Sequence, residues 1–357
     1  MQTREFDASR RAAFAERVLG ILNGGALSLM LSIGHRAGLF DVMSRQGAAT
    51  SEALAASAGL EERYVREWLG AMVAGGLVEY DAAQRAYRLP AEHAACLTRE
   101  ARPDNLAATA QWIPLLGRVE DEVLSCFERG GGVPYSSYQR FQEVMAEESD
   151  QSVVASLCEA ILPLVEGLAG ELARGIDALD VGCGSGRALN RLARSYPASR
   201  FTGYDLSPEA VAAARAEATH HGLRNVRFEV RDVADLRQDA SFDLVTAFDS
   251  IHDQARPAEV LAAVAGALRP DGVFLMQDIH GTSHVDRDAA HPLGAFLYTV
   301  SCLHCMTVSL AAGGAGLGAM WGVETARRML GEAGFTKVEV KSLPHDVMNL
   351  YYVARRG

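Results

Sequence analysis

The spacing of apolar residues changes along this chain. It indicates an N-terminal part made of helices and a C-terminal part in which strands and helices alternate. Up to residue 95 the apolar residues recur every three or four positions, which is the period of amphipathic helices. From residue 173 onward, short apolar runs alternate with amphipathic stretches, as strands and crossover helices do in a parallel sheet. The pattern predicts an α/β domain that follows a helical domain.

The N-terminal part is expected to be mostly helical. The predicted helices cover residues 7–22, 26–43 and 61–74, with a short helix after Thr50. Gly24-Gly25 is expected to separate the first two helices, because glycine is a poor helix former. The second helix is apolar on most of its sides, so we expect it to be buried.

Two short strands are expected next, at residues 77–80 and 86–89, which completes the element order of a winged helix. A winged helix that reads DNA places a basic helix in the major groove. The helix expected in that position opens with Glu61 and Glu62. Residues 1–90 contain 10 arginines, no lysine and 10 acidic residues, so they carry no net charge. We therefore predict packing and dimerisation through the N-terminal helices, and no binding of nucleic acid.

A glycine-rich turn follows the first apolar run of the second domain, in the sequence Asp180-Val-Gly-Cys-Gly-Ser-Gly186. Glycines lack a Cβ, so the backbone can turn sharply there and approach a ligand closely. The amphipathic stretch that begins at Arg187 directs free N–H groups at the same place. The spacing differs from the G-x-G-x-x-G of nicotinamide sites, and no Gly-Lys-Ser/Thr follows as in a triphosphate-binding loop.

Seven strands are predicted from residue 173 onward, and several of them end in an acidic residue. They cover residues 178–181, 200–205, 226–232, 242–248, 272–278, 337–343 and 349–354. Asp205 ends the second strand and Asp232 the third. A carboxylate at the end of the second strand, about 20 residues past the glycines, can accept hydrogen bonds from both hydroxyls of a ribose.

The glycine turn and the acidic strand ends resemble motif I and the motifs that follow it in the class I S-adenosylmethionine (SAM) methyltransferases. The resemblance implies a Rossmann-like domain of seven strands with SAM as its cofactor. In that family, the residue matching Asp232 contacts the adenine amino group, and the neighbour matching Val233 packs on the ring. The implied SAM-binding residues are Asp180, Gly182, Gly184, Gly186, Asp205, Leu206, Asp232, Val233, Phe248 and Asp249.

The whole chain resembles class I methyltransferases fused to a winged helix. Its N-terminal part is similar to the dimerisation domain of dimeric small-molecule O-methyltransferases, whose N-terminal helices intertwine with those of a second chain. The resemblance implies a homodimer. It also implies domains at residues 1–95 (winged helix) and 96–172 (helical connector), then 173–357 (methyltransferase) with a substrate-side insertion at 280–321.

His252 is the leading candidate for a catalytic base, because it directly follows the fourth predicted strand of the sheet. The small-molecule O-methyltransferases carry a catalytic histidine in an H-D-W motif at this point, and His252-Asp253 matches its first two positions. Gln254 replaces the tryptophan. Asp249 or Asp253 is expected to orient the histidine ring, and the sequence leaves open which of them does.

His280 and His304, both in the insertion, are the next candidates for a catalytic role. Cys302 and Cys305 flank His304 in a stretch that is predicted to form one continuous helix. A single pair of cysteines lacks the second half of a structural zinc site, so we expect no metal.

Four large side chains of the connector recur every three or four residues: Tyr135, Tyr138, Phe141 and Met145. They are expected to share one face of a helix. A buried core face is the favoured interpretation, and one or two of the tyrosines could also cap the SAM pocket.

The composition is that of a globular protein, with 49% hydrophobic and 22% charged residues. A formal net charge of −11 disfavours a general nucleic-acid binder. No apolar run is expected to reach the length of a membrane span, and the N-terminus has no signal-peptide core. Six scattered cysteines favour reduced thiols, so a cytoplasmic location is expected.

The sequence therefore predicts a SAM-dependent methyltransferase that transfers a methyl group to a hydroxyl or thiol of a small molecule. The alternative is a winged-helix transcriptional regulator that binds SAM or a metabolite without catalysis. The insertion from Gly281 to Met320 contains only one basic residue, Arg287, which disfavours DNA as the methyl acceptor.

Overall fold

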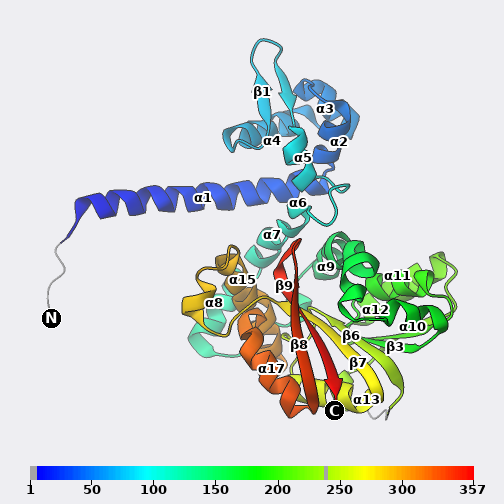
Figure 1. The fold of residues 1–357 in the computed structure, drawn as a ribbon. Helices are drawn as coiled ribbons and strands as arrows, with labels where there is room; N and C mark the ends of the chain where they lie inside the picture. The colour runs from blue at the N-terminus through cyan, green and yellow to red at the C-terminus, as the bar shows by residue number, and fades with distance from the viewer. Residues whose placement is uncertain (1–5, 237–239) are drawn as a thin grey trace. The chain divides into compact units, whose positions relative to one another are not determined.

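The computed structural model of the protein describes residues 6–236 and 240–357. The chain divides into two compact units, Met1–Pro114 and Leu115–Gly357. Figure 1 shows the elements of each unit with their labels.

The first unit begins with one long helix, α1 (Ala8–Arg36), whose N-terminus is capped by the Asp7 side chain. The predicted break at Gly24-Gly25 is wrong, because the helix runs through both glycines. Each costs only about 1 kcal/mol relative to alanine, and the good helix formers Leu22, Ala26 and Leu27 lie close on either side. The chain turns instead at Gly38, whose φ of 70° favours glycine, and α2 (Leu39–Gln46) follows.

The rest of this unit has the element order predicted for a winged helix. Its elements are α3 (Ser51–Ala58), α4 (Glu62–Ala74), the antiparallel pair β1 (Glu79–Asp81) and β2 (Ala86–Arg88), α5 (Ala91–Leu97), α6 (Leu106–Thr109) and the start of α7 (Trp112–Gly117). Trp68 connects α4 to both α1 and α2. Its ring packs edge-on against Phe40 at a centroid distance of 5.3 Å, and its Nε1 donates to the Met30 carbonyl.

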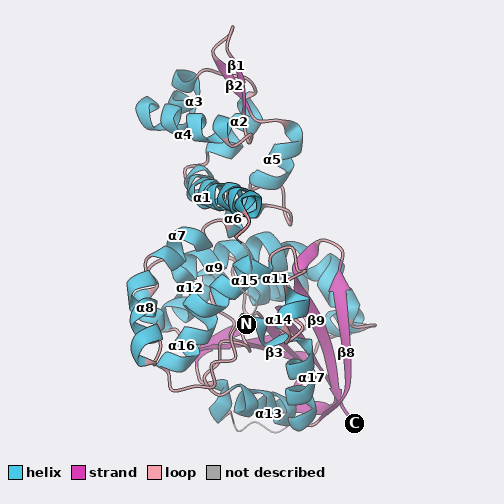
Figure 2. Ribbon diagram, turned by 90° about the vertical axis from the view of Figure 1, so that its left-hand side faces the viewer, coloured by secondary structure: helices cyan, strands magenta, loops and turns pink. Residues whose placement is uncertain are grey.

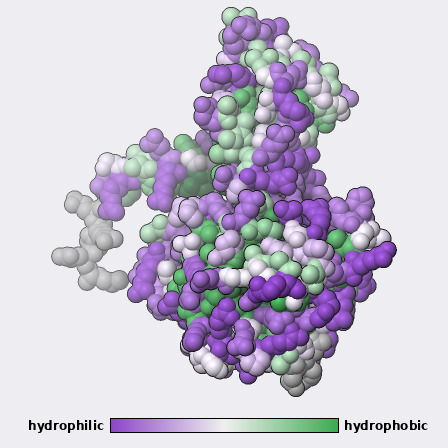
Figure 3. Space-filling view, turned by 45° about the vertical axis from the view of Figure 1, so that its right-hand side comes forward, coloured by the Kyte–Doolittle hydropathy of each residue, from purple (hydrophilic) through white to green (hydrophobic). Residues whose placement is uncertain are grey.

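The predicted burial of residues 26–43 is confirmed for most of their large apolar side chains: Leu39, Phe40 and Met43 are buried, and Leu27, Met30 and Leu31 pack half-buried against the same core. Most of α1, in contrast, is exposed. Only Ser32, Gly34 and His35 are buried on it. Large apolar side chains remain in solvent along its length: Phe14, Val18, Leu19, Ile21, Leu22, Leu29 and Ile33. Figure 3 shows apolar and polar surface mixed along this helix.

In the described part of the chain, two helices are long and apolar enough to cross a membrane, judged by length and composition alone, whereas the sequence was expected to contain no such run. They are α1 and the continuous helical stretch Gly294–Ala311. The second of these contributes buried side chains to the second unit, Leu297, Val300, His304, Cys305 and Val308 among them.

The second unit is built on a sheet of seven strands, which confirms the predicted Rossmann-like architecture. The strands are β3 (Asp177–Val181), β4 (Arg200–Asp205), β5 (Val226–Val230), β6 (Phe242–Phe248), β7 (Leu268–Ile279), β8 (Phe335–Leu343) and β9 (Asp346–Arg356). Their order is β5-β4-β3-β6-β7-β9-β8, with β9 antiparallel to both of its neighbours. The order reverses between β3 and β6, so the carboxyl ends of these strands border the crevice where such sheets bind ligands.

Helices cover both faces of the sheet, and the strands alternate their side chains between two cores (Figure 2). Leu179 and Met276 face α13 (Pro257–Ala267) and α17 (Gly322–Glu332). Ala178 and Leu275 face the opposite core, with α10 (Leu168–Arg174), α11 (Arg187–Ser195) and α12 (Pro208–His220). This alternation follows from the two-residue period of a strand.

The connector and the insertion are helical but irregular. The connector contains α8 (Glu120–Arg129), a 3-10 turn at Tyr135–Ser137, α9 (Phe141–Ser149), π-helical segments at Asp150–Val154 and Leu157–Ile161, and a 3-10 turn at Leu162–Leu164. The insertion contains α14 (Val285–Asp288), α15 (Gly294–Val300), the π-helix η6 (Ser301–Cys305), α16 (Met306–Ala311) and a 3-10 turn at Ala319–Trp321.

The single helix predicted for Tyr135 to Met145 is wrong. Arg140 has a left-handed φ of 68°, so the 3-10 turn at Tyr135 and the helix that starts at Phe141 are separate elements. The continuous helix predicted through Cys302 and Cys305 is present, and it locally widens there into η6.

Candidate active site

The glycine turn after β3 has the backbone that its sequence predicts. Gly182, Gly184 and Gly186 all have positive φ, of 68°, 51° and 70°. A Cβ on Gly182 would lie 2.5 Å from the Ser250 side chain, and one on Gly186 would lie 2.7 Å from Ala214. A Cβ on Gly184 would meet no described atom within 4 Å. The backbone at Gly184 is therefore open to a ligand, whereas the other two glycines are required by protein packing.

Asp205 lies against this turn, as the sequence predicts. Its Oδ2 accepts a hydrogen bond of 2.8 Å from the Gly184 N–H, and its Oδ1 accepts one of 2.8 Å from the Ser207 N–H. Burial raises the pKa of Asp205, although these backbone hydrogen bonds oppose that effect. The carboxylate thus lies at the open side of the turn, where a ligand's hydroxyl groups would approach.

Asp180 lies inside the end of β3 and is 3% exposed. It accepts a hydrogen bond of 2.7 Å from Thr246 Oγ1. Burial raises the pKa of Asp180 to about 7, and the charge of nearby Asp205 adds to this. Two desolvated carboxyl groups therefore lie together with no basic side chain hydrogen-bonded to either of them among the described residues.

The residues expected around an adenine lie at the ends of β4, β5 and β6. Val233 is buried, Leu206 is exposed and Phe248 is half-buried. Asp232 caps the turn that follows β5, with its Oδ1 accepting from the Ala234 N–H. Its Oδ2 accepts a hydrogen bond of 2.7 Å from Arg256, a partner that the sequence did not suggest.

His252 is bound by Asp278, and not by Asp249 or Asp253 as expected. Its Nδ1 lies 2.8 Å from Asp278 Oδ1, and both side chains are almost completely buried. Asp278 is the last residue but one of β7, and Asp205 is the last of β4, so the strand-end rule that singled out Asp205 could also have identified Asp278.

The carboxylate of Asp278 is itself held by two further donors. Trp321 Nε1 donates to Oδ1 at 2.9 Å, and the Ile279 N–H donates to the same oxygen at 2.8 Å. Burial opposes a positive charge on His252, but the Asp278 carboxylate outweighs it and raises the pKa of His252 well above its usual value. Cys305 hydrogen-bonds the same ring, and burial raises the pKa of its thiol.

His304 forms a wall of the site beside this pair. Its ring stacks on Phe141 at 4.4 Å and lies edge-on to Tyr138 and Tyr135, at 4.8 and 5.4 Å between centroids. Burial, together with the charge of His252, lowers the pKa of His304 to about 3. Such an imidazole stays neutral at pH 7 and is a weak base. The aromatic side chains of the connector thus gather around the insertion, although they do not share one helix.

The other predicted site residues contact partners other than His252. Tyr135 donates its hydroxyl hydrogen to Asp253 Oδ2, and burial raises the pKa of Asp253 to about 6. Asp249 accepts a hydrogen bond from Gln277 Nε2. The His280 ring lies edge-on to His291 at 5.2 Å, and burial lowers the pKa of His280.

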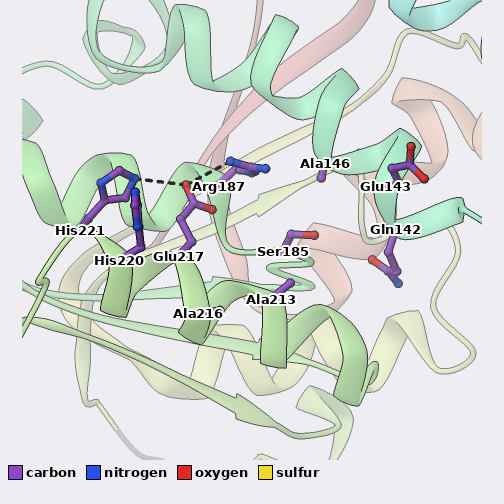
Figure 4. A pocket seen from close by; sticks show the side chains of 10 residues that line it. All are labelled: Gln142, Glu143, Ala146, Ser185, Arg187, Ala213, Ala216, Glu217, His220 and His221. Carbon is purple, nitrogen blue, oxygen red and sulfur yellow. Dashed lines mark hydrogen bonds and ion pairs between the residues drawn. The ribbon is translucent and has the colours of Figure 1, made fainter. Parts of the chain in front are cut away.

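A cavity of about 530 Å³ lies on the helical side of the glycine turn (Figure 4). It is lined by side chains of α9, the start of α11 and α12, and in it Glu217 pairs with both Arg187 and His221. Ser185 of the turn borders this cavity, but Asp205 and His252 do not. The residues predicted to bind SAM through its ribose and to act as the base therefore do not line this cavity.

The described residues contain no group of three histidine, cysteine or acidic side chains placed to hold a metal ion. All six cysteines are free thiols.

Comparison with known families identifies both domains. Residues 25–99 match the Rv2258c-like winged HTH domain, and residues 172–311 match a methyltransferase domain. The chain thus carries a winged helix followed by a methyltransferase domain, as the sequence predicted.

The curated relatives each match less than a third of the chain. The ubiquinone biosynthesis O-methyltransferase of Xanthomonas euvesicatoria pv. vesicatoria is 35% identical over 110 residues, which are 30% of this chain and 45% of that protein. The fatty-acid O-methyltransferase of Mycolicibacterium smegmatis is 36% identical over 101 residues, which are 28% of this chain and 36% of that protein. The chain therefore spans less than half the length of these relatives.

Solved structures resemble the whole chain. Human N-acetylserotonin methyltransferase, solved in complex with SAM, superposes with a TM-score of 0.68 at 19% identity and covers 100% of both chains. An O-methyltransferase family protein from Burkholderia thailandensis superposes with a TM-score of 0.63 at 22% identity and covers 96% of this chain and 98% of that one. At these identities the likeness shows the fold.

The buried pair of His252 and Asp278 predicts that the free energy of unfolding depends on pH. The folded pKa of His252 lies above its unfolded value of about 6.5. The contribution of the pair is therefore complete below that pH and is lost as the pH rises through the folded pKa. Asp278→Asn should lower the free energy of unfolding by roughly 3–5 kcal/mol in mildly acidic buffer, because it leaves the other partner buried without its counter-charge. The loss should shrink in alkaline buffer.

Urea unfolding of both proteins across this pH range measures the effect. Asp271→Asn, an exposed carboxyl group on the turn within β7, is the matched control. An equal loss at every pH would show that His252 is not charged in the folded chain.

Proposed function

We propose that this chain is a SAM-dependent methyltransferase that methylates a hydroxyl or thiol group of a small molecule. The observation that carries the proposal is the buried His252–Asp278 pair at the carboxyl ends of β6 and β7. It lies beside a glycine turn whose open side carries Asp205. A base next to a nucleoside-type site is what methyl transfer to a protonated acceptor requires.

The residues present fit SAM. Gly184 offers an open backbone, and Asp205 is placed to accept hydrogen bonds from ribose hydroxyls. Asp180 and Asp205 are desolvated carboxyl groups with raised pKa values, so a ligand that carries positive charge would stabilise their ionised forms. When bound, SAM supplies a methyl group that is already activated on a sulfonium. Asp232, Val233, Leu206, Phe248 and Asp249 are the further residues that we assign to this site.

The chain's own part in the reaction is to position the acceptor and to take its proton. His252 accepts the acceptor's proton at Nε2, since Nδ1 is occupied by Asp278, and the acceptor would take the place of the Cys305 thiol that hydrogen-bonds the ring. Asp278 holds the ring in orientation and stabilises the imidazolium that forms. The rings of Tyr135, Tyr138, Phe141 and His304 exclude water from the acceptor side. Asp253 lies within this site through its hydrogen bond to Tyr135, whereas we place His280 and His304 in supporting positions.

Donor binding is tested by Asp205→Ala. We expect the variant to bind SAM more weakly by roughly 1.5–3 kcal/mol, the value of hydrogen bonds to a charged group. Calorimetry measures this directly, with Asp271→Asn as the control. An affinity within about twofold of the wild type, in a folded variant, would mean that Asp205 does not bind the ribose.

Catalysis is tested by His252→Ala with S-adenosylhomocysteine release as the readout. Turnover should fall roughly 10²- to 10⁴-fold, the usual value of a positioned base, while SAM affinity stays nearly unchanged. In the wild type, kcat/KM should rise with pH through the raised pKa of His252, because only the neutral ring accepts a proton. Near-normal turnover of the variant on a phenol would make His252 a wall of the pocket. Tight SAM binding without turnover on any acceptor would favour a regulator.

We also propose that the chain forms a homodimer through its N-terminal helices. The support is the exposed apolar surface of α1, with Phe14 66% and Leu22 65% exposed, because water-exposed apolar surface of this extent marks an interaction site. Residues 1–95 would then dimerise, 96–172 connect, and 173–357 catalyse with the insertion 280–321 on the substrate side. Six free thiols support a reducing, cytoplasmic location.

Light scattering tests the dimer. The full chain should have twice the mass of one chain at micromolar concentration, and removal of the first 22 residues should give a monomer or an aggregate. Replacement of Leu19 and Leu22 by glutamine should weaken the dimer, whereas Glu16→Gln on the same helix should not. A full-length monomer would contradict the proposal.

A further inference from the structure

Arg256 forms two ion pairs at the turn that follows β5. Its Nη2 donates to Asp232 Oδ2 at 2.7 Å, and its Nη1 donates to Asp235 Oδ1 at 3.0 Å. Asp232 caps this turn and Asp235 ends it, so one guanidinium holds both ends of the segment that carries Val233. Arg256 itself comes from a distant part of the chain, because it directly precedes α13 and lies four residues after His252.

Stability alone does not account for these ion pairs. The Arg256 side chain is 42% exposed, and those of Asp232 and Asp235 are 34% and 64% exposed. Ion pairs at such exposure contribute little to the free energy of folding, because water screens the charges and the side chains lose conformational freedom. The same exposure leaves the Asp232 carboxylate within reach of a ligand.

The Asp232 carboxylate is held at both of its oxygens. Oδ1 accepts a hydrogen bond of 2.9 Å from the Ala234 N–H, and Oδ2 accepts the one from Arg256. Each carboxylate oxygen can accept two hydrogen bonds, so acceptor capacity remains for a ligand. With the backbone contact alone, the carboxyl group would be free to turn, since the terminal torsion of aspartate has a broad minimum. Arg256 therefore fixes the direction in which the remaining lone pairs point.

The loop that carries Arg256 is fixed by the insertion. The Ala315 N–H donates to the Ala255 carbonyl at 3.0 Å. A Cβ on Gly314 would lie 2.4 Å from the Ala255 Cα, so the two backbones are in close contact there. On the other side of Arg256, α13 begins with Pro257, whose ring fixes its φ. The guanidinium is thus presented to Asp232 from a constrained backbone.

We propose that Arg256 is a positioning residue of the donor site, which holds the Asp232 carboxylate so that it accepts a hydrogen bond from the 6-amino group of the SAM adenine. This inference rests on the proposed function, which assigns Asp232 to the SAM site. Arg256 acts through Asp232 and touches no reacting atom. A hydrogen bond weakens steeply when its geometry is poor, so the orientation of the carboxylate decides how strongly the amino group is bound.

The test compares S-adenosylhomocysteine with its 6-deamino analogue, in which a hydrogen atom replaces the amino group. Calorimetry gives both affinities. The wild type should prefer S-adenosylhomocysteine by roughly 10- to 100-fold, the effect of a hydrogen bond to a charged group. Arg256→Met removes the guanidinium donors and should weaken binding of S-adenosylhomocysteine by roughly 3- to 10-fold. It should leave binding of the analogue nearly unchanged, because the analogue has no amino group for Asp232 to bind.

Two further variants and the kinetics separate positioning from general damage. Arg256→Lys keeps a charge that can reach one carboxylate, so it should restore part of the preference. Arg328→Met is the matched control, because Arg328 forms an ion pair with Glu332 on α17 and is 60% exposed; it should leave both affinities unchanged. Arg256→Met should raise the KM for SAM and leave kcat nearly unchanged, as expected when only donor binding is weakened.

Equal losses of affinity for both compounds in Arg256→Met would overturn the inference, because they would indicate a damaged pocket. Tighter binding of S-adenosylhomocysteine would also overturn it, since the guanidinium would then compete with adenine for Asp232. A wild type that binds both compounds equally would show that Asp232 does not bind the amino group, and would leave the methyltransferase proposal intact. A wild type that does not bind S-adenosylhomocysteine would overturn the proposed function, and this inference with it.

Discussion

The arrangement of the site depends on the buried contact between His252 and Asp278. It joins the loop after β6 to the end of β7, and Trp321 attaches the segment before α17 to the same carboxylate. A buried ion pair pays a desolvation cost that only good geometry and further hydrogen bonds offset. Here Asp278 Oδ1 accepts from a ring nitrogen, an indole N–H and a backbone N–H. Three elements far apart in sequence are thereby held at one point.

The parallel sheet explains why so many acidic groups meet. Parallel strands present their carboxyl ends at one edge, so Asp205, Asp249 and Asp278 all follow or end strands there. Each of these carboxylates is desolvated by burial, and each has different hydrogen-bond partners. Backbone N–H groups hold Asp205, and His252 pairs with one oxygen of Asp278. Asp249 and Asp278 each keep one buried oxygen without a partner among the described residues.

Local sequence was sufficient where one residue type determines one conformation. The glycine turn was predicted, because positive φ and close approach require glycine, whereas its hydrogen bond to Asp205 is known only from the structure. Gly24-Gly25 was misleading because glycine also occurs within helices, and Gly38 ends α1 through its left-handed φ. The partner of His252 was missed because sequence proximity favoured Asp249 and Asp253, whereas strand pairing brings Asp278 next to it. The spacing of apolar residues predicts helices and strands, but it does not show which distant segments come into contact.

The acceptor side is built by the two segments whose structure was hardest to predict. The connector and the insertion are in close contact at two points. Tyr138 donates a hydrogen bond of 2.5 Å to the Leu303 carbonyl. At Gly132 the two backbones approach so closely that a Cβ would lie 2.0 Å from the Thr307 carbonyl oxygen. A glycine is therefore required at this contact, since any side chain would push the insertion away from the connector. The π-helical widening of η6 occurs at the same level and carries His304 and Cys305 to the site. Irregular helices of this kind recur at functional sites because they change which side chains face inward. The sheet thus positions the glycine turn and Asp205, whereas the surroundings of His252 depend on this packing of two irregular segments.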